Sequence, residues 1–198
     1  MKLLKGFYAV ALAIGAMGAQ AAHLSFSFVD GISPGSYEAP SFTAGVNASV
    51  HSGSIQNVYL QPEGLDAADT FLVVSKLGGS NGSASVNVGD ASSFSFVWGS
   101  PDSFNVIDIF SDGFGMVSYT GSQLGSTNGF TANGVNTNTG LFTIAGVNGA
   151  TIDHIVFRSS GVAFEAAVAA PVPEPETYAL MLAGLAAMGF VARRRRSD

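Results

Sequence analysis

Three aspartates near the middle of the chain are the side chains best suited to bind a metal ion. Asp102, Asp108 and Asp112 lie close together in the sequence, and Gly113 follows the last of them. Calcium takes about six to eight oxygen ligands, which carboxylates supply, but this spacing fits no EF-hand loop. Asp102 is better placed to cap its own Ser-Pro-Asp-Ser turn. We therefore predict no metal site and no cofactor, with a calcium ion as the alternative.

The histidines and glutamates form no recognisable catalytic set. His154 follows Asp153 in a strand-like pattern, so their side chains are expected on opposite faces of a sheet. The chain has no Gly-x-Ser-x-Gly elbow, no cysteine and no paired histidine spacing for zinc. An acid pair for glycoside hydrolysis would come from Glu38, Glu63 and Glu165, and the last is expected to be structural. The prediction is that the chain is not an enzyme, with a secreted hydrolase as the weaker alternative.

Trp98 is the single tryptophan, and it alternates with Phe94 and Phe96. Such a set forms either one face of a core strand or a platform on which sugar rings stack. Aromatic residues at period two usually pack inward, which favours the core. If the ring is exposed instead, Trp98 and Asp102 together are the candidate ligand face of a carbohydrate-binding module.

The elements that position these residues are predicted to be strands. Residues 22–170 are rich in Gly, Ser, Asn, Val and Phe and poor in Lys, Arg and Glu. Alternating apolar and polar residues recur between turn clusters, which is typical of an all-β sandwich, here expected to be a single jelly-roll-like domain. The segments with strand-like patterns are 24–28, 55–60, 71–76, 83–88, 94–98, 104–110, 115–120, 140–145, 152–157 and 162–166.

Two further expectations concern connections and helices in this body. The run from Phe96 to Asn105 reads as a hairpin around a Gly-Ser-Pro-Asp turn. Residues 122–140 are polar and turn-rich, so they are predicted to be a long surface loop. Continuous helices are expected only at the two ends of the chain.

The N-terminus has the features of a secretory signal peptide. Lys2 and Lys5 precede an apolar stretch, which ends in the small-x-small sequence of Ala19, Gln20 and Ala21. Residues 1–21 are therefore predicted to be removed on export. The remaining residues 22–175 contain two cations against twelve acids, a formal charge of −10. This balance argues against nucleic-acid binding.

The C-terminal tail, residues 171–198, contains three pieces in a fixed order. Pro173, Glu174 and Pro175 lie in a proline-rich break, which no regular helix crosses. The uncharged run 178–192 makes a helix of about 22 Å, which is short for a hydrocarbon core of about 30 Å. The basic stop is formed by Arg193, Arg194, Arg195 and Arg196. By the positive-inside rule these arginines stay in the cytoplasm, and the body is expected on the outer side of the inner membrane.

This order of break, apolar helix and basic stop resembles the PEP-CTERM sorting signal of Gram-negative bacteria. The resemblance implies that an exosortase, a membrane-embedded cysteine transpeptidase, recognises the tail and cuts near Pro173–Pro175. The run from Trp98 to Asn105 is also similar to a Trp-Gly-Ser-x-Asp-x-Tyr-Asn element of some exosortase-dependent surface proteins, with Phe104 in place of Tyr. The resemblance thus concerns sorting and carries no enzymatic activity.

These observations together predict an exported surface or extracellular-matrix protein. Before processing it would be held in the inner membrane by its tail. Afterwards it would reside at the cell surface, in the outer envelope or outside the cell. Association with exopolysaccharide in a biofilm is the expected role of the body, and a carbohydrate-binding module is the alternative.

Overall fold

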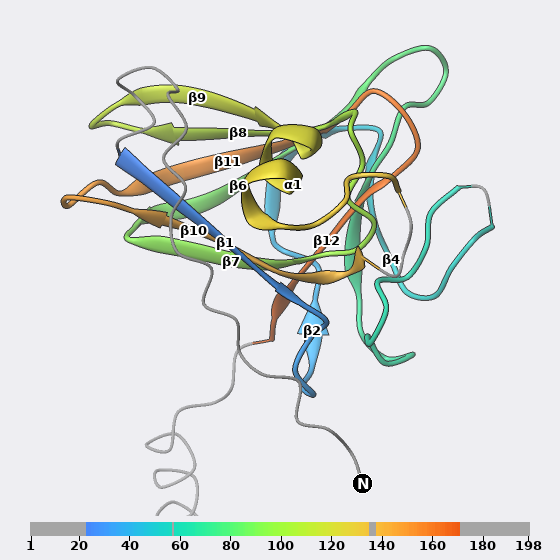
Figure 1. The fold of residues 1–198 in the computed structure, drawn as a ribbon. Coiled ribbons are helices and arrows are strands. Elements are labelled where there is room, and N and C mark those ends of the chain that lie inside the picture. Colours follow the sequence, from blue (N-terminus) through green and yellow to red (C-terminus); the bar gives the residue numbers. More distant parts are fainter. Residues whose placement is uncertain (1–22, 57, 135–137, 171–198) are drawn as a thin grey trace, which may run out of the picture.

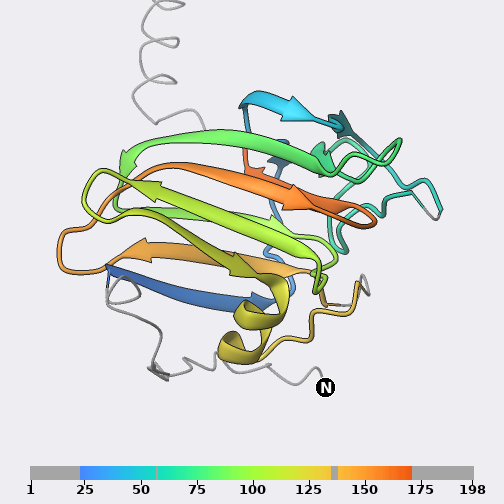
Figure 2. The ribbon, with the colours of Figure 1, turned by 90° about the horizontal axis from the view of Figure 1, so that it is seen from above.

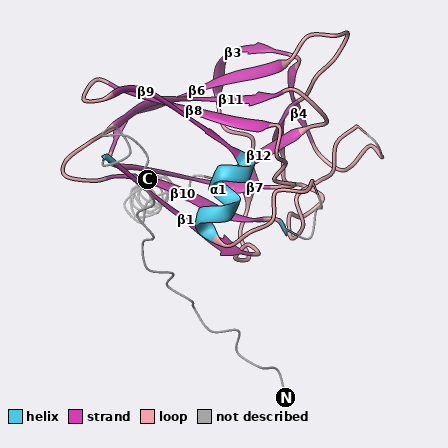
Figure 3. Cartoon of the chain, turned by 45° about the horizontal axis from the view of Figure 1, so that its top comes forward, coloured by secondary structure: helices cyan, strands magenta, loops and turns pink. Residues whose placement is uncertain are grey.

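The structure is a computed structural model that describes residues 23–56, 58–134 and 138–170, and strands dominate this part of the chain (Figure 3). The predicted signal peptide with Ala19 and Ala21, and the predicted tail with Pro173–Pro175, the run 178–192 and Arg193–Arg196, lie outside the described residues. Among the described residues, no helix has the length and apolar character needed to cross a membrane.

One sheet contains seven strands. Its path runs β1–β10–β7–β12–β5–β4, and β2 pairs with the end of β12. The strands are β1 (Leu24–Asp30), β2 (Tyr37–Glu38), β4 (Ala48–His51), β5 (Phe71–Val74), β7 (Ser93–Trp98), β10 (Gly140–Gly146) and β12 (Phe164–Ala169). Every strand pair in this sheet is antiparallel. The path begins at β1 and ends at β4, which are therefore its two edge strands.

The other sheet contains five antiparallel strands in the order β3–β6–β11–β8–β9. They are β3 (Phe42–Val46), β6 (Gly82–Ala91), β8 (Asn105–Ser111), β9 (Gly115–Thr120) and β11 (Ile152–Ser159). Figure 2 shows β3 at one edge of this sheet, next to β6 and then β11.

The two sheets share one apolar core. Phe157 of β11 lies with its ring centroid 5.0 Å from that of Phe96 and 4.8 Å from that of Phe164, which belong to the other sheet. All three side chains are fully buried, and each such burial contributes about 1.5–3 kcal/mol. The prediction of an all-β fold is therefore confirmed. The strands form because apolar residues alternate with polar ones along each of them, which turns one apolar face toward this core.

A second, smaller apolar cluster lies on the outer face of the seven-stranded sheet. Residues 52–56 and 58–70, which we call the covering segment, place Tyr59 and Leu65 against Phe71, Val73 and Val97. Because these side chains are buried, the outer face of the sheet is sealed here and does not face solvent.

The segment predicted to be a surface loop begins with a helix, α1 (Gly121–Asn128). Thr120 and Gln123 form a reciprocal capping box at its start, and Gly129 ends it in a left-handed conformation with φ 79°. Leu124 enters the core, and α1 contacts β1, β8 and β9 at one side of the sandwich (Figure 1). The expectation of helices only at the chain ends was therefore wrong.

The predicted hairpin from Phe96 to Asn105 is also wrong. β7 belongs to the seven-stranded sheet and β8 to the five-stranded sheet, so residues 99–104 cross between the sheets. A turn of Gly, Ser, Pro and Asp suits such a corner as well as it suits a hairpin. The strand predicted over residues 55–60 is not found there. Ile55 and Tyr59 instead form an isolated bridge, in which the backbone N–H of Tyr59 donates to the carbonyl of Ile55 at 3.0 Å.

Candidate functional site

Trp98 lies in the core of the sandwich, and its side chain is 0% exposed. Its ring stacks on Phe164 at a centroid distance of 5.0 Å and an interplanar angle of 12°. Phe142 and Phe130 meet it edge-on. The indole Nε1 has no hydrogen-bond partner among the described residues. Trp98 therefore serves packing, and a sugar-stacking platform at this residue is not available.

Asp102 shapes the crossing between the sheets. Its carbonyl accepts a hydrogen bond from the backbone N–H of Asn105 at 3.1 Å, which closes the turn. Asp102 also forms an isolated antiparallel β-bridge with Asn133, in the segment that follows α1. Burial raises the pKa of its carboxyl, although a hydrogen bond from the backbone of Ser103 lowers it in part. The turn role predicted for Asp102 agrees with this geometry.

The three aspartates proposed as calcium ligands are not brought together. Asp102 lies in the crossing, Asp108 in the middle of β8, and Asp112 is exposed in the turn between β8 and β9. Among the residues that the structure describes, no three His, Asp or Glu side chains gather as a set of metal ligands.

Glu165 is a buried carboxyl group. It lies on the outer face of β12, beneath the covering segment, and is 1% exposed. The hydroxyl of Ser100 donates to its Oε2 at 2.5 Å, and the backbone N–H of Leu60 donates to its Oε1 at 3.2 Å. The same crossing that buries Trp98 thus delivers Ser100 to this carboxyl.

Burial raises the pKa of Glu165 to about 7, and the hydrogen bonds from Ser100 and Leu60 only partly oppose this shift. The packing is close, since a Cβ added at Gly99 would lie 2.9 Å from both Glu165 Cβ and Pro62 Cγ. Glu165 therefore joins the covering segment, the crossing and β12. It is titratable near neutral pH, and its burial fits the structural role that the sequence suggested.

A second polar network lies on the outer face of the five-stranded sheet. Asp108 on β8 accepts two hydrogen bonds from Arg158 on β11, from Nε at 2.6 Å and from Nη2 at 2.7 Å. The hydroxyl of Ser118 on β9 donates to the same carboxylate. The hydrogen bond to Asp108 raises the pKa of Arg158, so the guanidinium stays positively charged.

His154 and Asp153 point toward each other, contrary to the prediction from strand alternation. His154 Nδ1 lies 2.8 Å from Asp153 Oδ2, and its ring stacks on Phe110 at a centroid distance of 4.0 Å. The reason is a register shift in β11 between Ile152 and His154, which interrupts the two-residue period.

The structure also aligns a serine, a histidine and a tyrosine that sequence reasoning missed. His51 Nε2 lies 2.7 Å from Ser49 Oγ, and His51 Nδ1 lies 2.8 Å from the hydroxyl of Tyr59. Ser49 and His51 share one face of the edge strand β4, and Tyr59 comes from the covering segment. The two-residue spacing of Ser49 and His51 places both side chains on one face of a strand, but it could indicate this contact only if a strand had been predicted at β4. The third group is a phenol and not the carboxylate of a hydrolase triad.

Comparison with known proteins concerns the C-terminal segment that follows the β-sandwich body. Residues 171–196 match the PEP-CTERM protein-sorting motif. The chain thus carries a PEP-CTERM signal, which marks an exported protein that an exosortase recognises and that is held at a membrane before processing. No curated protein and no solved structure matches the chain.

Proposed function

We propose that the chain is a non-enzymatic surface or matrix protein whose β-sandwich body, of jelly-roll-like type, is delivered outside the cell by exosortase processing. The observation that carries the proposal is the order of parts. The described β-sandwich extends to Ala170, whose backbone N–H is still hydrogen-bonded, and the sorting motif matches residues 171–196. In this proposal the signal peptide, residues 1–21, starts export, and the body remains without cofactor in the outer envelope or an exopolysaccharide matrix.

The polar groups of the body support a structural role. Glu165 is sealed from solvent, and Asp108 is held by Arg158 and Ser118. Each of these carboxyl groups is engaged in holding strands or segments together. The proposal therefore assigns the chemistry of processing to the exosortase and the role of substrate to this chain.

The test is the mass of the mature protein after cell fractionation. We expect a C-terminus near residues 173–176 in surface or medium fractions, with or without an attached group. Deletion of Arg193–Arg196, or replacement of Pro173, Glu174 and Pro175 by alanine, should leave unprocessed precursor in the inner membrane. Normal processing of both variants would overturn the proposal, as would wild-type protein that keeps its arginine tail.

A carbohydrate-binding role is the second candidate, and one observation favours a particular face for it. Phe110 and His154 are stacked beside the Asp108–Arg158 pair on the outer face of the five-stranded sheet. Rings and fixed hydrogen-bonding groups are the usual components of sugar sites. Affinity electrophoresis in neutral polysaccharide would test it. Retardation that is lost in Phe110→Ala would support this role, and unretarded wild-type protein would set it aside.

A further inference from the structure

The strand that leads into the sorting tail is held firmly to its end. Phe164 and Ala166 of β12 lie in the core, and Val168 and Ala169 pair with Glu38 and Tyr37 of β2. The next backbone N–H, of Ala170, still donates to the carbonyl of Ser36 at 2.9 Å. The body is therefore ordered up to the residue before the sorting motif begins.

The strand β2 is itself fastened to the covering segment. The backbone N–H of Tyr37 donates to Asp69 Oδ1 at 2.9 Å, and the N–H of Thr70 donates to the carbonyl of Tyr37 at 3.3 Å. Asp69 is 5% exposed, and its Oδ2 also accepts from the N–H of Asp66 at 2.8 Å. Pulling the tail away from the body would thus require breaking several connected hydrogen bonds.

The reach of the chain beyond Ala170 is short, whatever its conformation. Pro173 and Pro175 lie three and five residues after Ala170. At no more than about 3.6 Å per residue, they stay within about 11 Å and 18 Å of it. A domain of about 150 residues has a radius of gyration of about 15 Å. An enzyme that acts at these prolines must therefore lie against this end of the body.

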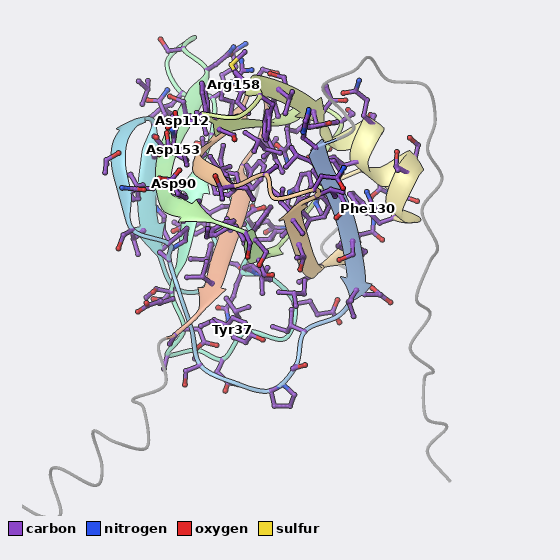
Figure 4. The ribbon with its side chains drawn as sticks, turned by 90° about the vertical axis from the view of Figure 1, so that its left-hand side faces the viewer. Tyr37, Asp90, Asp112, Phe130, Asp153 and Arg158 are labelled. Atoms are coloured by element: carbon purple, nitrogen blue, oxygen red, sulfur yellow. The ribbon has the colours of Figure 1, made fainter. Side chains whose placement is uncertain are left out.

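The surface at this end is formed by residues Ser33–Glu38, which we call the exit surface. Ser33, Pro34, Gly35, Ser36 and Glu38 are exposed, and the hydroxyl of Tyr37 closes the segment by donating to the carbonyl of Ser33 at 2.8 Å. Figure 4 shows Tyr37 at the end of the molecule where β12 ends, and Asp112 at the opposite end.

The charge of the exit surface distinguishes between a lipid and a protein partner. It contains Glu38 and no cation, since the two cations of the described residues are Lys76 and Arg158. Binding to anionic headgroups depends on clusters of Lys and Arg, so this surface has no electrostatic attraction for an anionic lipid surface, and a protein partner is favoured. We propose that the exit surface docks on the exosortase during processing and is the part of the body that the enzyme contacts. This inference rests on the proposed function.

The first test measures the rate of processing in membranes that contain the exosortase. The double variant Ser36→Lys and Glu38→Lys places two long cationic side chains in the contact without changing the backbone bonds of β2. We expect processing to slow about tenfold. Ser92→Lys with Asp112→Lys makes the same change in charge at exposed positions elsewhere, and it should process at the wild-type rate.

A linker sharpens this test. A Gly/Ser insertion of about twelve residues after Ala170 spans about 20 Å and frees the enzyme from contact with the body. In the Ser36→Lys, Glu38→Lys background it should restore most of the lost rate. Slow processing that the linker does not relieve would overturn the inference, and so would equal rates for the exit-surface variant and its matched control.

The second test uses the absence of cysteine from the chain. Ser36→Cys or Asp112→Cys introduces a single thiol, to which a photoreactive crosslinker is attached. We expect a covalent adduct with the exosortase from position 36 and none from position 112. Adducts from both positions would refute the docking surface but leave the proposed function standing. The same holds if neither position gives an adduct while wild-type precursor is processed. Wild-type precursor that is never processed would refute the proposed function as well.

Discussion

Glu165 and Asp108 lie on opposite outer faces of the sandwich, and each is almost completely removed from solvent. Asp108 is matched by the guanidinium of Arg158, which lies in the next strand and is itself 46% exposed. The donors to the carboxyl of Glu165 in the described part of the chain are neutral, namely the hydroxyl of Ser100 and the backbone N–H of Leu60. The two carboxyl groups are therefore stabilised in different ways when buried: Asp108 is paired with a counter-ion, and Glu165 retains its proton to a higher pH.

The difference follows from what covers each face. The five-stranded sheet leaves Arg158 partly in water, where a cation is retained at little cost. The seven-stranded sheet is sealed at Glu165 by the covering segment, and desolvation is the largest cause of the raised pKa of this group. The chain has very few cations to place there, because Lys76 and Arg158 are the two between residues 22 and 175. A protonated acid is thus the consistent solution beneath the covering segment.

The largest expected effect is a dependence of stability on pH that belongs to Glu165. The pKa is 4.5 for the ordinary group and about 7 in the folded chain. As the pH rises between these values, the unfolded chain releases its proton while the folded chain keeps it. The free energy of unfolding should therefore fall by roughly 3 kcal/mol across this window and then level off.

Glu165→Gln isolates this effect, because its amide keeps the shape and cannot ionise. The difference in unfolding free energy between wild type and variant, measured by urea denaturation from pH 4 to 8, should follow the predicted fall. Other titrating groups are common to both proteins and cancel. Parallel profiles for the two proteins would show that Glu165 has an ordinary pKa and is not sealed by the covering segment.

The next largest effect is the loss of stability expected when Asp108 loses its partner Arg158. Arg158→Met leaves the buried carboxyl of Asp108 without its counter-ion and with Ser118 as its remaining side-chain donor, which should cost about 2 kcal/mol. This value is below that for a fully buried pair, since Arg158 is half in solvent. Unlike the effect at Glu165, the loss should be present throughout pH 6–8.

A double-mutant cycle provides the control for this prediction. Asp108→Asn removes the charge that Arg158 compensates, so it should recover most of the stability lost in Arg158→Met. Urea denaturation of the four proteins measures the coupling between the two side chains. If the double variant is as unstable as the sum of the two single changes, the pair contributes nothing to the fold.

Part of this arrangement was readable from the sequence. Alternation of apolar residues predicted the strands that carry Phe96, Phe157 and Phe164, because a sheet with one face in a core imposes that period. The capping pattern of Thr120 and Gln123 was also present as a signal for α1, but the abundance of Gly, Ser and Asn favoured a loop.

The rest depends on contacts between distant residues. Ser100 and Glu165 are 65 positions apart, and no local pattern indicates that the crossing between the sheets brings them together. The shift of register at Ile152 turned His154 toward Asp153, and a bulge leaves little trace in composition. The sequence did mark Trp98–Asn105 as distinctive, and the structure explains this run as the corner that buries Trp98 and positions Ser100.

The smallest expected effect compares the two serines that serve these carboxyl groups. Ser100→Ala removes one of two neutral donors from Glu165, so it should cost about 1 kcal/mol and raise the pKa of Glu165 further. Ser118→Ala removes a donor from Asp108, where Arg158 still supplies two hydrogen bonds, so its cost should be under about 0.5 kcal/mol. Denaturation at several pH values measures both quantities. An upward shift of the pH midpoint in Ser100→Ala, and none in Ser118→Ala, would confirm that only Glu165 depends on neutral donors. Equal losses would mean that the counter-ion does not distinguish the two faces.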